Sequence, residues 1–325
     1  MPTITLAQAI NQSLAKALEE LDDVVLMGED VGLTGGVFRV TDGLRDKFGA
    51  DRVIDSPVAE SGIAGVGFGL AVGGIRPVLE MQFMGFSYPA LDQVINHISR
   101  IRNRSRHRFT APLVIRMPYG GGIGAAEHHS ESTEALYAHV PGLKVVVPSR
   151  PRDAAGLLRT AIEDPDPVIF LEPIRLYRAV KEDVPEESFH VPLGAASVER
   201  PGNDITLISW GAMMKETRAA ADELAAAGTS AEVLDVRTLV PLDRQTISDS
   251  ANRTGRVVVV HEAPRTAGYA AEIAALVQEH CLYRLEAPVL RVTGWDTVVP
   301  LKRAEHHYLP TVARIVAGAR RVLEA

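Results

Sequence analysis

The chain has 325 residues, of which 46% are hydrophobic and 23% are charged, and its formal net charge is −7. This balance is typical of a globular protein with a sizeable core, and the length indicates about two domains. The negative charge argues against nucleic-acid binding, which usually needs a basic surface. Cys281 is the single cysteine, which excludes a disulfide within the chain and a cysteine-based zinc site.

The N-terminal residues lack the basic and apolar regions of a signal peptide. No apolar run reaches the roughly 18 residues that a membrane-spanning helix needs. We therefore expect a cytoplasmic protein.

The first part of the chain alternates helical and extended patterns. Thr5 and Gln8 have the spacing of a capping box, and apolar residues then recur at helical spacing as far as Leu21, which predicts an amphipathic helix. The glycine-rich segment 60–74 predicts a helix that packs closely against another backbone, because glycine otherwise disfavours helices. The other segments predict strands at 24–27, 77–83, 113–117, 144–147 and 168–171, and helices at 92–102 and 152–163.

A polar segment with three prolines, residues 181–203, is the best linker candidate. A second alternating set follows, with strands at 204–211, 230–236, 256–262 and 287–292, and with helices that end at 227, span 243–253, and begin at 269 and about 310. Strands and helices that alternate at this spacing indicate βαβ units. We predict two α/β domains with parallel or mixed sheets, residues 1–180 and 204–325.

Polar side chains follow several predicted strands, at the edge where open α/β sheets bind ligands. They are Glu29, Glu60, Gln82, His128 and His129, and the two histidines follow a glycine-rich loop at 119–124. The sequence has no dinucleotide-binding fingerprint, P-loop or G-x-S-x-G motif, which disfavours those chemistries.

Nine motifs carry a specific resemblance. They are GEDVG (28–32), FRVTDGL (38–44), PVAESGIAGVGFGLA (57–71), EMQFMGFSYPALDQV (80–94), AAEHHSES (125–132), PGLKVVVPS (141–149), DPVIFLEPIRLYR (166–178), TGRVVVVHEAP (254–264) and LEAPVLRVTG (285–294). In order and spacing they resemble the E1 β subunits of 2-oxo acid dehydrogenase complexes over nearly the whole chain. Segment 121–133 and the HEAP run are most similar to the branched-chain members, and the pyruvate and acetoin members are close.

The resemblance implies that residues 1–180 form a thiamine-diphosphate pyrimidine-binding domain and residues 204–325 a transketolase C-terminal-like domain. It implies that Glu60 hydrogen-bonds N1′ of the cofactor aminopyrimidine, where burial would raise its pKa and favour proton sharing. It implies that His129 exchanges protons when the acyl group passes to a lipoyl arm, a task suited to the pKa of histidine. From position alone, Glu60 is more simply an acid at a helix N-terminus, and either His128 or His129 is a loop histidine.

The resemblance also implies a wider set of contacts. Implied cofactor-binding residues are Glu29, Val58, Ala59, Glu60, Gln82, Phe86, Ser87, Tyr88 and Pro89, and implied substrate-facing residues are Phe83, Met84, Gly85, Phe86 and His129. Many family members have Tyr where this chain has Phe86, so ring stacking remains possible while the hydroxyl is lost. Glu29 is equally well explained as a solvated loop acid.

A K⁺ site made largely of backbone carbonyls is frequent in this family. The matching residues are Ala111, Leu113, Val114, Ala161, Asp164 and Asp166. Oxygen ligands suit such a hard cation. A tight turn through 164–167, which would simply connect a helix to a strand, is at least as good an explanation.

The chain has no G-D-G motif for Mg²⁺ and diphosphate, so the resemblance implies that an E1 α subunit holds both in an α2β2 heterotetramer. We expect an oxidoreductase that is active only with that subunit, decarboxylates a branched-chain 2-oxo acid and passes the acyl group to the lipoyl-bearing E2 core. The alternatives are a pyruvate or acetoin substrate, a mainly structural scaffold subunit, and a transketolase-like transfer. Arginines at 100, 102, 104, 106 and 108 form either a docking surface for an acidic partner or a solvated face.

Overall fold

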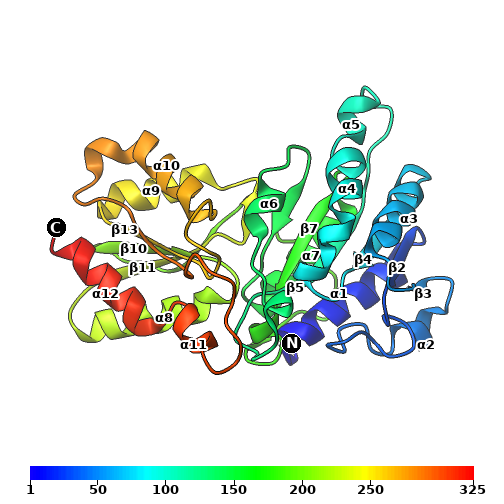
Figure 1. The fold of residues 1–325 in the computed structure, drawn as a ribbon, viewed down its shortest axis with the longest axis horizontal. Helices are drawn as coiled ribbons and strands as arrows, with labels where there is room; N and C mark the ends of the chain where they lie inside the picture. Colours follow the sequence, from blue (N-terminus) through cyan, green and yellow to red (C-terminus); the bar gives the residue numbers. More distant parts are fainter. The chain divides into compact units, whose positions relative to one another are not determined.

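The computed structural model describes residues 1–325, which form two compact units (Figure 1). The first unit comprises residues 1–119 and 136–193, and the second comprises residues 120–135 and 194–325. The chain therefore passes through the second unit twice. Segment 120–135, which carries His128 and His129, lies along the chain between the two parts of the first unit, but by its contacts it belongs to the second unit.

A parallel sheet forms the centre of the first unit. Six strands of this sheet belong to the first unit and lie in the order β6-β7-β5-β4-β2-β3, and every neighbouring pair among them is parallel, so their carboxyl ends lie along one edge. Their bounds are β2 (Val24–Gly28), β3 (Val53–Asp55), β4 (Arg76–Glu80), β5 (Val114–Tyr119), β6 (Lys144–Val146) and β7 (Val168–Pro173). A separate antiparallel pair joins β1 (Thr3–Thr5) to β8 (Lys181–Asp183).

Helices around this sheet follow the predicted periodicities. Helix α1 (Leu6–Glu20) begins with the expected capping box, in which Thr5 and Gln8 each satisfy the other's backbone N–H. Helix α3 (Glu60–Val72) packs on β4, and a Cβ on Gly67 would lie 2.4 Å from the Leu79 side chain, which explains the glycine. The other elements are α2 (Leu44–Phe48), η1 (Met84–Ala90), α6 (Glu134–Ala138), α7 (Pro151–Glu163) and η4 (Ile174–Leu176).

The single helix predicted at 92–102 is wrong in detail. The segment is divided into α4 (Leu91–Gln93), a π-helical turn η2 (Val94–Ile98) and α5 (Ile101–Arg104). The Ser99 N–H donates to the Val94 carbonyl, five residues earlier, which widens the helix by one residue.

The second unit is built on a sheet of order β14-β13-β10-β11-β9, in which only β9 runs antiparallel to its neighbour. The strands of this unit are β9 (Ser197–Arg200), β10 (Ile205–Ser209), β11 (Ala231–Asp235), β12 (Thr238–Val240), β13 (Val257–Val260) and β14 (Leu290–Val292). Its helices are η3 (Glu127–His129), α8 (Met213–Ala226), α9 (Arg244–Thr254), α10 (Ala270–Cys281), η5 (Leu282–Arg284), α11 (Glu305–Tyr308) and α12 (Val312–Leu323).

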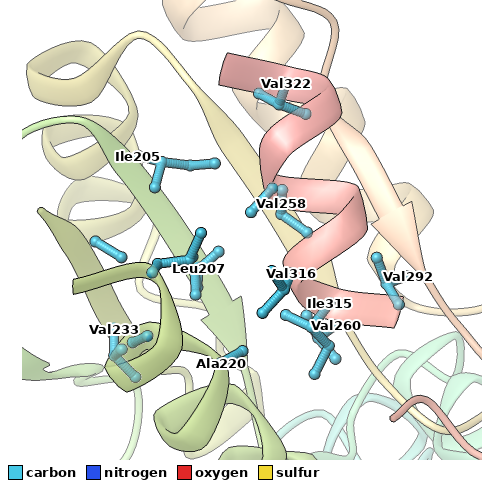
Figure 2. Packing of buried hydrophobic residues seen from close by; sticks show 14 of the residues in the cluster. Ile205, Leu207, Ala220, Val233, Val258, Val260, Val292, Ile315, Val316 and Val322 are labelled. Carbon is cyan, nitrogen blue, oxygen red and sulfur yellow. The ribbon is translucent and has the colours of Figure 1, made fainter. Parts of the chain in front are cut away.

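The core of the second unit lies between this sheet and helices α8 and α12. Figure 2 shows Leu207 of β10 and Val258 and Val260 of β13 on the same side as Ile315 and Val316 of α12. Burial of these aliphatic side chains supplies the main favourable free energy of folding. The polar segment 181–203 is ordered at both ends, because β8 pairs with β1 and β9 pairs with β11. No helix in residues 1–325 combines the length and apolar character needed to cross a membrane.

Candidate active site

Two carboxyl groups lie close together at the carboxyl edge of the first unit's sheet. Glu29 follows β2, is 3% exposed and accepts a hydrogen bond from the backbone N–H of Ala59. Its Oε1 is buried and has no hydrogen-bond partner. Burial raises the pKa of the Glu29 carboxyl, and the nearby charge of Glu60 raises it further. Glu60 is half-buried and begins α3, so the structure brings the two predicted acids together.

The residue before Glu29 has to be glycine for a steric reason. A Cβ there would lie 2.7 Å from the backbone oxygen of Glu80 on the neighbouring strand. The close approach of β2 and β4 at this point sets where both strands end. In the G-E-D sequence at the end of this buried strand, Gly28 therefore allows close packing and Glu29 places a carboxyl group at the edge of the sheet.

The residues after β4 supply an amide and two aromatic rings. Gln82 donates from Nε2 to Asp30 at 3.3 Å, which links the loop after β4 to the loop after β2. The rings of Phe83 and Phe86 meet edge to face with centroids 5.2 Å apart. Phe83 also contacts Phe38 at 5.4 Å, so the aromatic pair is held from the far side.

The other predicted cofactor and substrate residues of this unit divide into exposed and enclosed groups. Val58, Ala59 and Pro89 are exposed, and Tyr88 is half-buried. Met84, Gly85 and Ser87 are buried. The Ser87 hydroxyl donates to the Met84 carbonyl and also bonds the Tyr137 hydroxyl, so it holds the turn η1 rather than facing outward.

A fully buried ionic network lies behind this edge and was missed by the sequence analysis. Arg116 of β5 bonds Glu80 of β4 at 2.8 Å and Glu172 of β7 at 2.7 and 3.0 Å. The Tyr177 hydroxyl donates to Glu172, and the Tyr177 ring contacts Phe38, which in turn contacts Phe83. The network thus connects three neighbouring strands to the aromatic pair. Its signal was present, because β5 and β7 each contain one charged residue in an otherwise apolar strand and β4 ends on Glu80.

His129 is carried by the second unit. It ends the short turn η3, is half-buried, and donates its backbone N–H to the Ala126 carbonyl at 3.0 Å. Its neighbour His128 is exposed. The same unit buries Glu134, whose pKa burial raises to about 8, with the charge of Glu262 adding to the shift.

The HEAP run, residues 261–264, directly follows β13 in the second unit. His261 is buried with its ring stacked on Trp210 at 5.3 Å, and burial lowers its pKa to about 3, so the ring is neutral at physiological pH. Glu262 follows and is 3% exposed. This run therefore places a buried acid, rather than a titrating histidine, near segment 120–135.

The predicted K⁺ site draws on two places in the first unit: Ala161, Asp164 and Asp166 lie at the connection from α7 to β7, and Ala111, Leu113 and Val114 lie at the start of the neighbouring strand β5. The Lys144 ammonium bonds both oxygens of the Asp164 carboxylate at 2.7 and 2.6 Å, and Asp166 pairs with Arg102 at 2.6 Å. The carbonyls of Ala111, Leu113 and Ala161 each accept a backbone N–H. These contacts favour the tight turn, which the ion pairs close. No cluster of three or more His, Cys, Asp or Glu side chains arranged to hold a metal occurs in residues 1–325.

The arginine-rich segment 100–108 is mostly exposed. Arg102 is the member with an ion pair, to Asp166, and Arg104 approaches the ring nitrogen of His97 at 3.5 Å. The segment is thus partly structural, and its other arginines face solvent in the isolated chain.

Comparisons with known proteins agree with this architecture. Residues 2–180 match the transketolase pyrimidine-binding domain, and residues 194–315 match the transketolase C-terminal domain. A split-gene transketolase, titled an inactive β4 tetramer, superimposes with a TM-score of 0.82 over 99% of both chains at 23% identity, which shows the shared fold.

The chain is also similar over its full length to curated proteins. It is 48% identical over 325 residues to the pyruvate dehydrogenase E1 component subunit beta of Acholeplasma laidlawii, covering 100% of this chain and 99% of that protein. It is 49% identical over 324 residues to the proteins of the same name from Bacillus subtilis and Staphylococcus epidermidis, covering 100% of each.

Proposed function

Because this chain belongs to the E1 β-subunit family of the 2-oxo acid dehydrogenases, we propose that with an E1 α subunit it forms the decarboxylase of a pyruvate dehydrogenase complex. Full-length identity of 48–49% to subunits of that name is the observation that carries the proposal. The sequence motifs had favoured a branched-chain substrate. That preference is not confirmed, and the relatives support the alternative, pyruvate.

The groups at the carboxyl edge of the first unit fit the aminopyrimidine end of thiamine diphosphate. An aminopyrimidine offers ring nitrogens and a flat aromatic face, and the edge offers carboxyl oxygens of Glu29 and Glu60, the amide of Gln82 and the ring of Phe86. The buried Oε1 of Glu29, which has no partner, supports a site that a ligand completes. When bound, thiamine diphosphate supplies the carbon nucleophile for 2-oxo acid decarboxylation.

In this proposal Glu60 holds a proton at N1′ of the aminopyrimidine. Burial and the nearby charge of Glu60 raise the pKa of the Glu29 carboxyl, so Glu29 retains a proton beside Glu60 more readily than an isolated acid does. Phe86 packs on the ring face, and the absence of a tyrosine hydroxyl there leaves orientation to Gln82 and the acids. The E1 α subunit supplies the ligands of Mg²⁺ and diphosphate.

His129 acts at the second half of the reaction. The disulfide of the lipoyl group opens, one sulfur bonds the acyl carbon as a thioester, and the other sulfur takes a proton. We assign donation of that proton to His129, because an imidazole can both donate and accept a proton, and this side chain is only half-buried, so that a lipoyl arm can reach it. His128, which is exposed, is the alternative donor.

The test of Glu60 is a Glu60→Gln variant in the reconstituted α/β complex. We expect turnover to fall by about 10²-fold or more, the usual scale for a general acid–base group, while assembly is retained. Glu186→Gln, an exposed glutamate of the same unit, is the matched control. An active Glu60→Gln enzyme would refute the assignment, and loss of assembly alone would favour a scaffold role.

The test of substrate compares pyruvate with 3-methyl-2-oxobutanoate on the same complex. We expect the higher kcat/KM with pyruvate. Extra methylene groups change binding by only about 1–3 kcal/mol each, so the preference is to be read as a ratio of kcat/KM values. A higher value with the branched substrate would restore the branched-chain assignment.

A further inference from the structure

The glycine-rich loop before His129 is held by two buried carboxylates of the second unit. Glu262 accepts the backbone N–H of Gly121 at 3.1 Å. Glu305 uses both of its oxygens, accepting the N–H of Gly122 at 2.5 Å and the N–H of Gly124 at 2.9 Å. Glu262 and Glu305 are 3% and 6% exposed, so water competes little for these bonds.

The glycines make this arrangement possible. At Gly120 φ is +91°, and a Cβ would lie 2.6 Å from Oε1 of Glu262. At Gly121 a Cβ would lie 3.3 Å from Oε1 of Glu305. Side chains at these positions would displace the carboxylates, so the otherwise unexplained glycine run is what the two glutamates require.

The held loop is continuous with the turn that carries His129. The Gly120 N–H donates to the Glu131 carbonyl at 2.9 Å, which closes residues 120–131 into one loop. Inside it, Ser130 donates its N–H to Glu127 at 2.9 Å, and His129 donates to Ala126 at 3.0 Å. His129 thus lies on a short loop whose stem is fixed by Glu131 and whose far side is fixed by Glu262 and Glu305.

We propose that Glu262 and Glu305 are positioning residues, which hold the glycine loop by its backbone and so fix His129 for proton donation to the lipoyl group. This inference rests on the proposed role of His129. The two glutamates touch neither substrate nor cofactor in this account. Their replacement should therefore impair acyl transfer to lipoyl far more than it impairs decarboxylation.

The test uses Glu305→Gln in the reconstituted α/β complex. Glutamine keeps the volume but has one acceptor oxygen, so its NH2 group faces one of the two glycine N–H donors. We expect reductive acylation of a free lipoyl domain to fall at least about tenfold in kcat, with pyruvate oxidation by ferricyanide changing less than about twofold. Glu262→Gln should act in the same direction. Glu232→Gln, another buried glutamate of the second unit, should leave the ratio of the two rates unchanged.

His129→Ala separates this inference from the proposed function. If His129→Ala leaves reductive acylation intact, the role of His129 fails, and the positioning proposal falls with it. If His129→Ala is impaired while Glu305→Gln is not, only the positioning proposal is overturned. In the double variant we expect no further loss beyond His129→Ala, whereas additive losses would show that Glu305 acts independently of His129.

Hydrogen exchange on the assembled complex gives a readout that does not depend on catalysis. In the wild type, we expect the amides of Gly121, Gly122 and Gly124 to be protected although Gly122 itself is exposed. Glu305→Gln should speed their exchange while β10 and β13 remain unchanged. Fast exchange of 121–124 in the wild type would contradict the proposal, even if a variant failed to assemble.

Discussion

Replacement of Arg116 by methionine tests the buried ionic network most directly. The guanidinium is fully buried between Glu80 and Glu172, at 2.8 and 2.7 Å, and methionine would keep much of its volume without its charge. Two carboxyl groups would then lie buried without a cation. Removing one partner of a buried ion pair costs about 3–5 kcal/mol, a large share of the 5–15 kcal/mol that stabilises a typical domain.

The loss should depend on pH in a defined direction. Burial already raises the pKa of the Glu80 carboxyl, and Arg116 is the charge that opposes this shift. In Arg116→Met the folded-state pKa of Glu80 should rise further above its unfolded value of about 4.3. The folded protein would then bind more protons than the unfolded chain, so its stability should fall as pH rises from about 5 towards 8.

Thermal unfolding of the α/β complex at pH 5.5 and pH 8 measures both effects. Arg102→Met is the matched control, because Arg102 pairs with Asp166 while 35% of its side chain is exposed, and such a pair contributes only about 0–1 kcal/mol. We expect a much larger fall in Tm for Arg116→Met, and a larger one at pH 8. Equal shifts in the two variants, or a larger loss at acid pH, would refute the reasoning.

Two further predictions concern stability. Burial raises the pKa of Glu134 to about 8 in the folded chain, so the folded chain binds one more proton than the unfolded chain and stability should decline between about pH 4.5 and 8. Glu134→Gln should flatten this decline, measured as the urea-unfolding midpoint against pH. Equal slopes of midpoint against pH in the wild type and the variant would contradict the prediction. Gly142→Ala should cost about 2–5 kcal/mol by denaturant unfolding, since φ is +95° and a Cβ would lie 2.1 Å from the Ser99 oxygen. Gly49→Ala, with φ +86° and open space, should cost only the backbone strain, and equal losses would exclude a role for the clash.

Local patterns were sufficient for much of the fold. The capping box at Thr5 and the buried runs after it predicted α1 and β2 closely, because helix caps and apolar periodicity depend on neighbours in sequence. The π-helical turn at 94–98 was not predictable in this way. At its end the Ser99 carbonyl lies close against Gly142, and such a contact between segments distant in sequence is a tertiary constraint.

The candidate site shows the same limit. Position marked Glu29 and Glu60 as polar groups at the binding edge, and the family resemblance implied their role; the structure brings the two acids together. The assignment of segment 120–135 to the second unit depends on bonds such as Gly122 to Glu305, which join residues 183 positions apart. No local pattern encodes such a pairing. The glycine run indicated only that another group lies close to this backbone, not that the group is a pair of glutamates.

The partners of each buried glutamate indicate whether that glutamate has a structural role or belongs to a ligand site. Glu80 and Glu172 share the guanidinium of Arg116, Glu305 accepts two backbone N–H groups, and burial raises the pKa of Glu134 to about 8. The first three acids have partners within the chain, whereas Glu134 also keeps a buried oxygen without a hydrogen-bond partner. Glu29 receives one N–H from Ala59, faces the charge of Glu60 and keeps a buried oxygen without a partner. A polar ligand at Glu29 would complete its hydrogen bonding, which supports the proposal that the aminopyrimidine binds there.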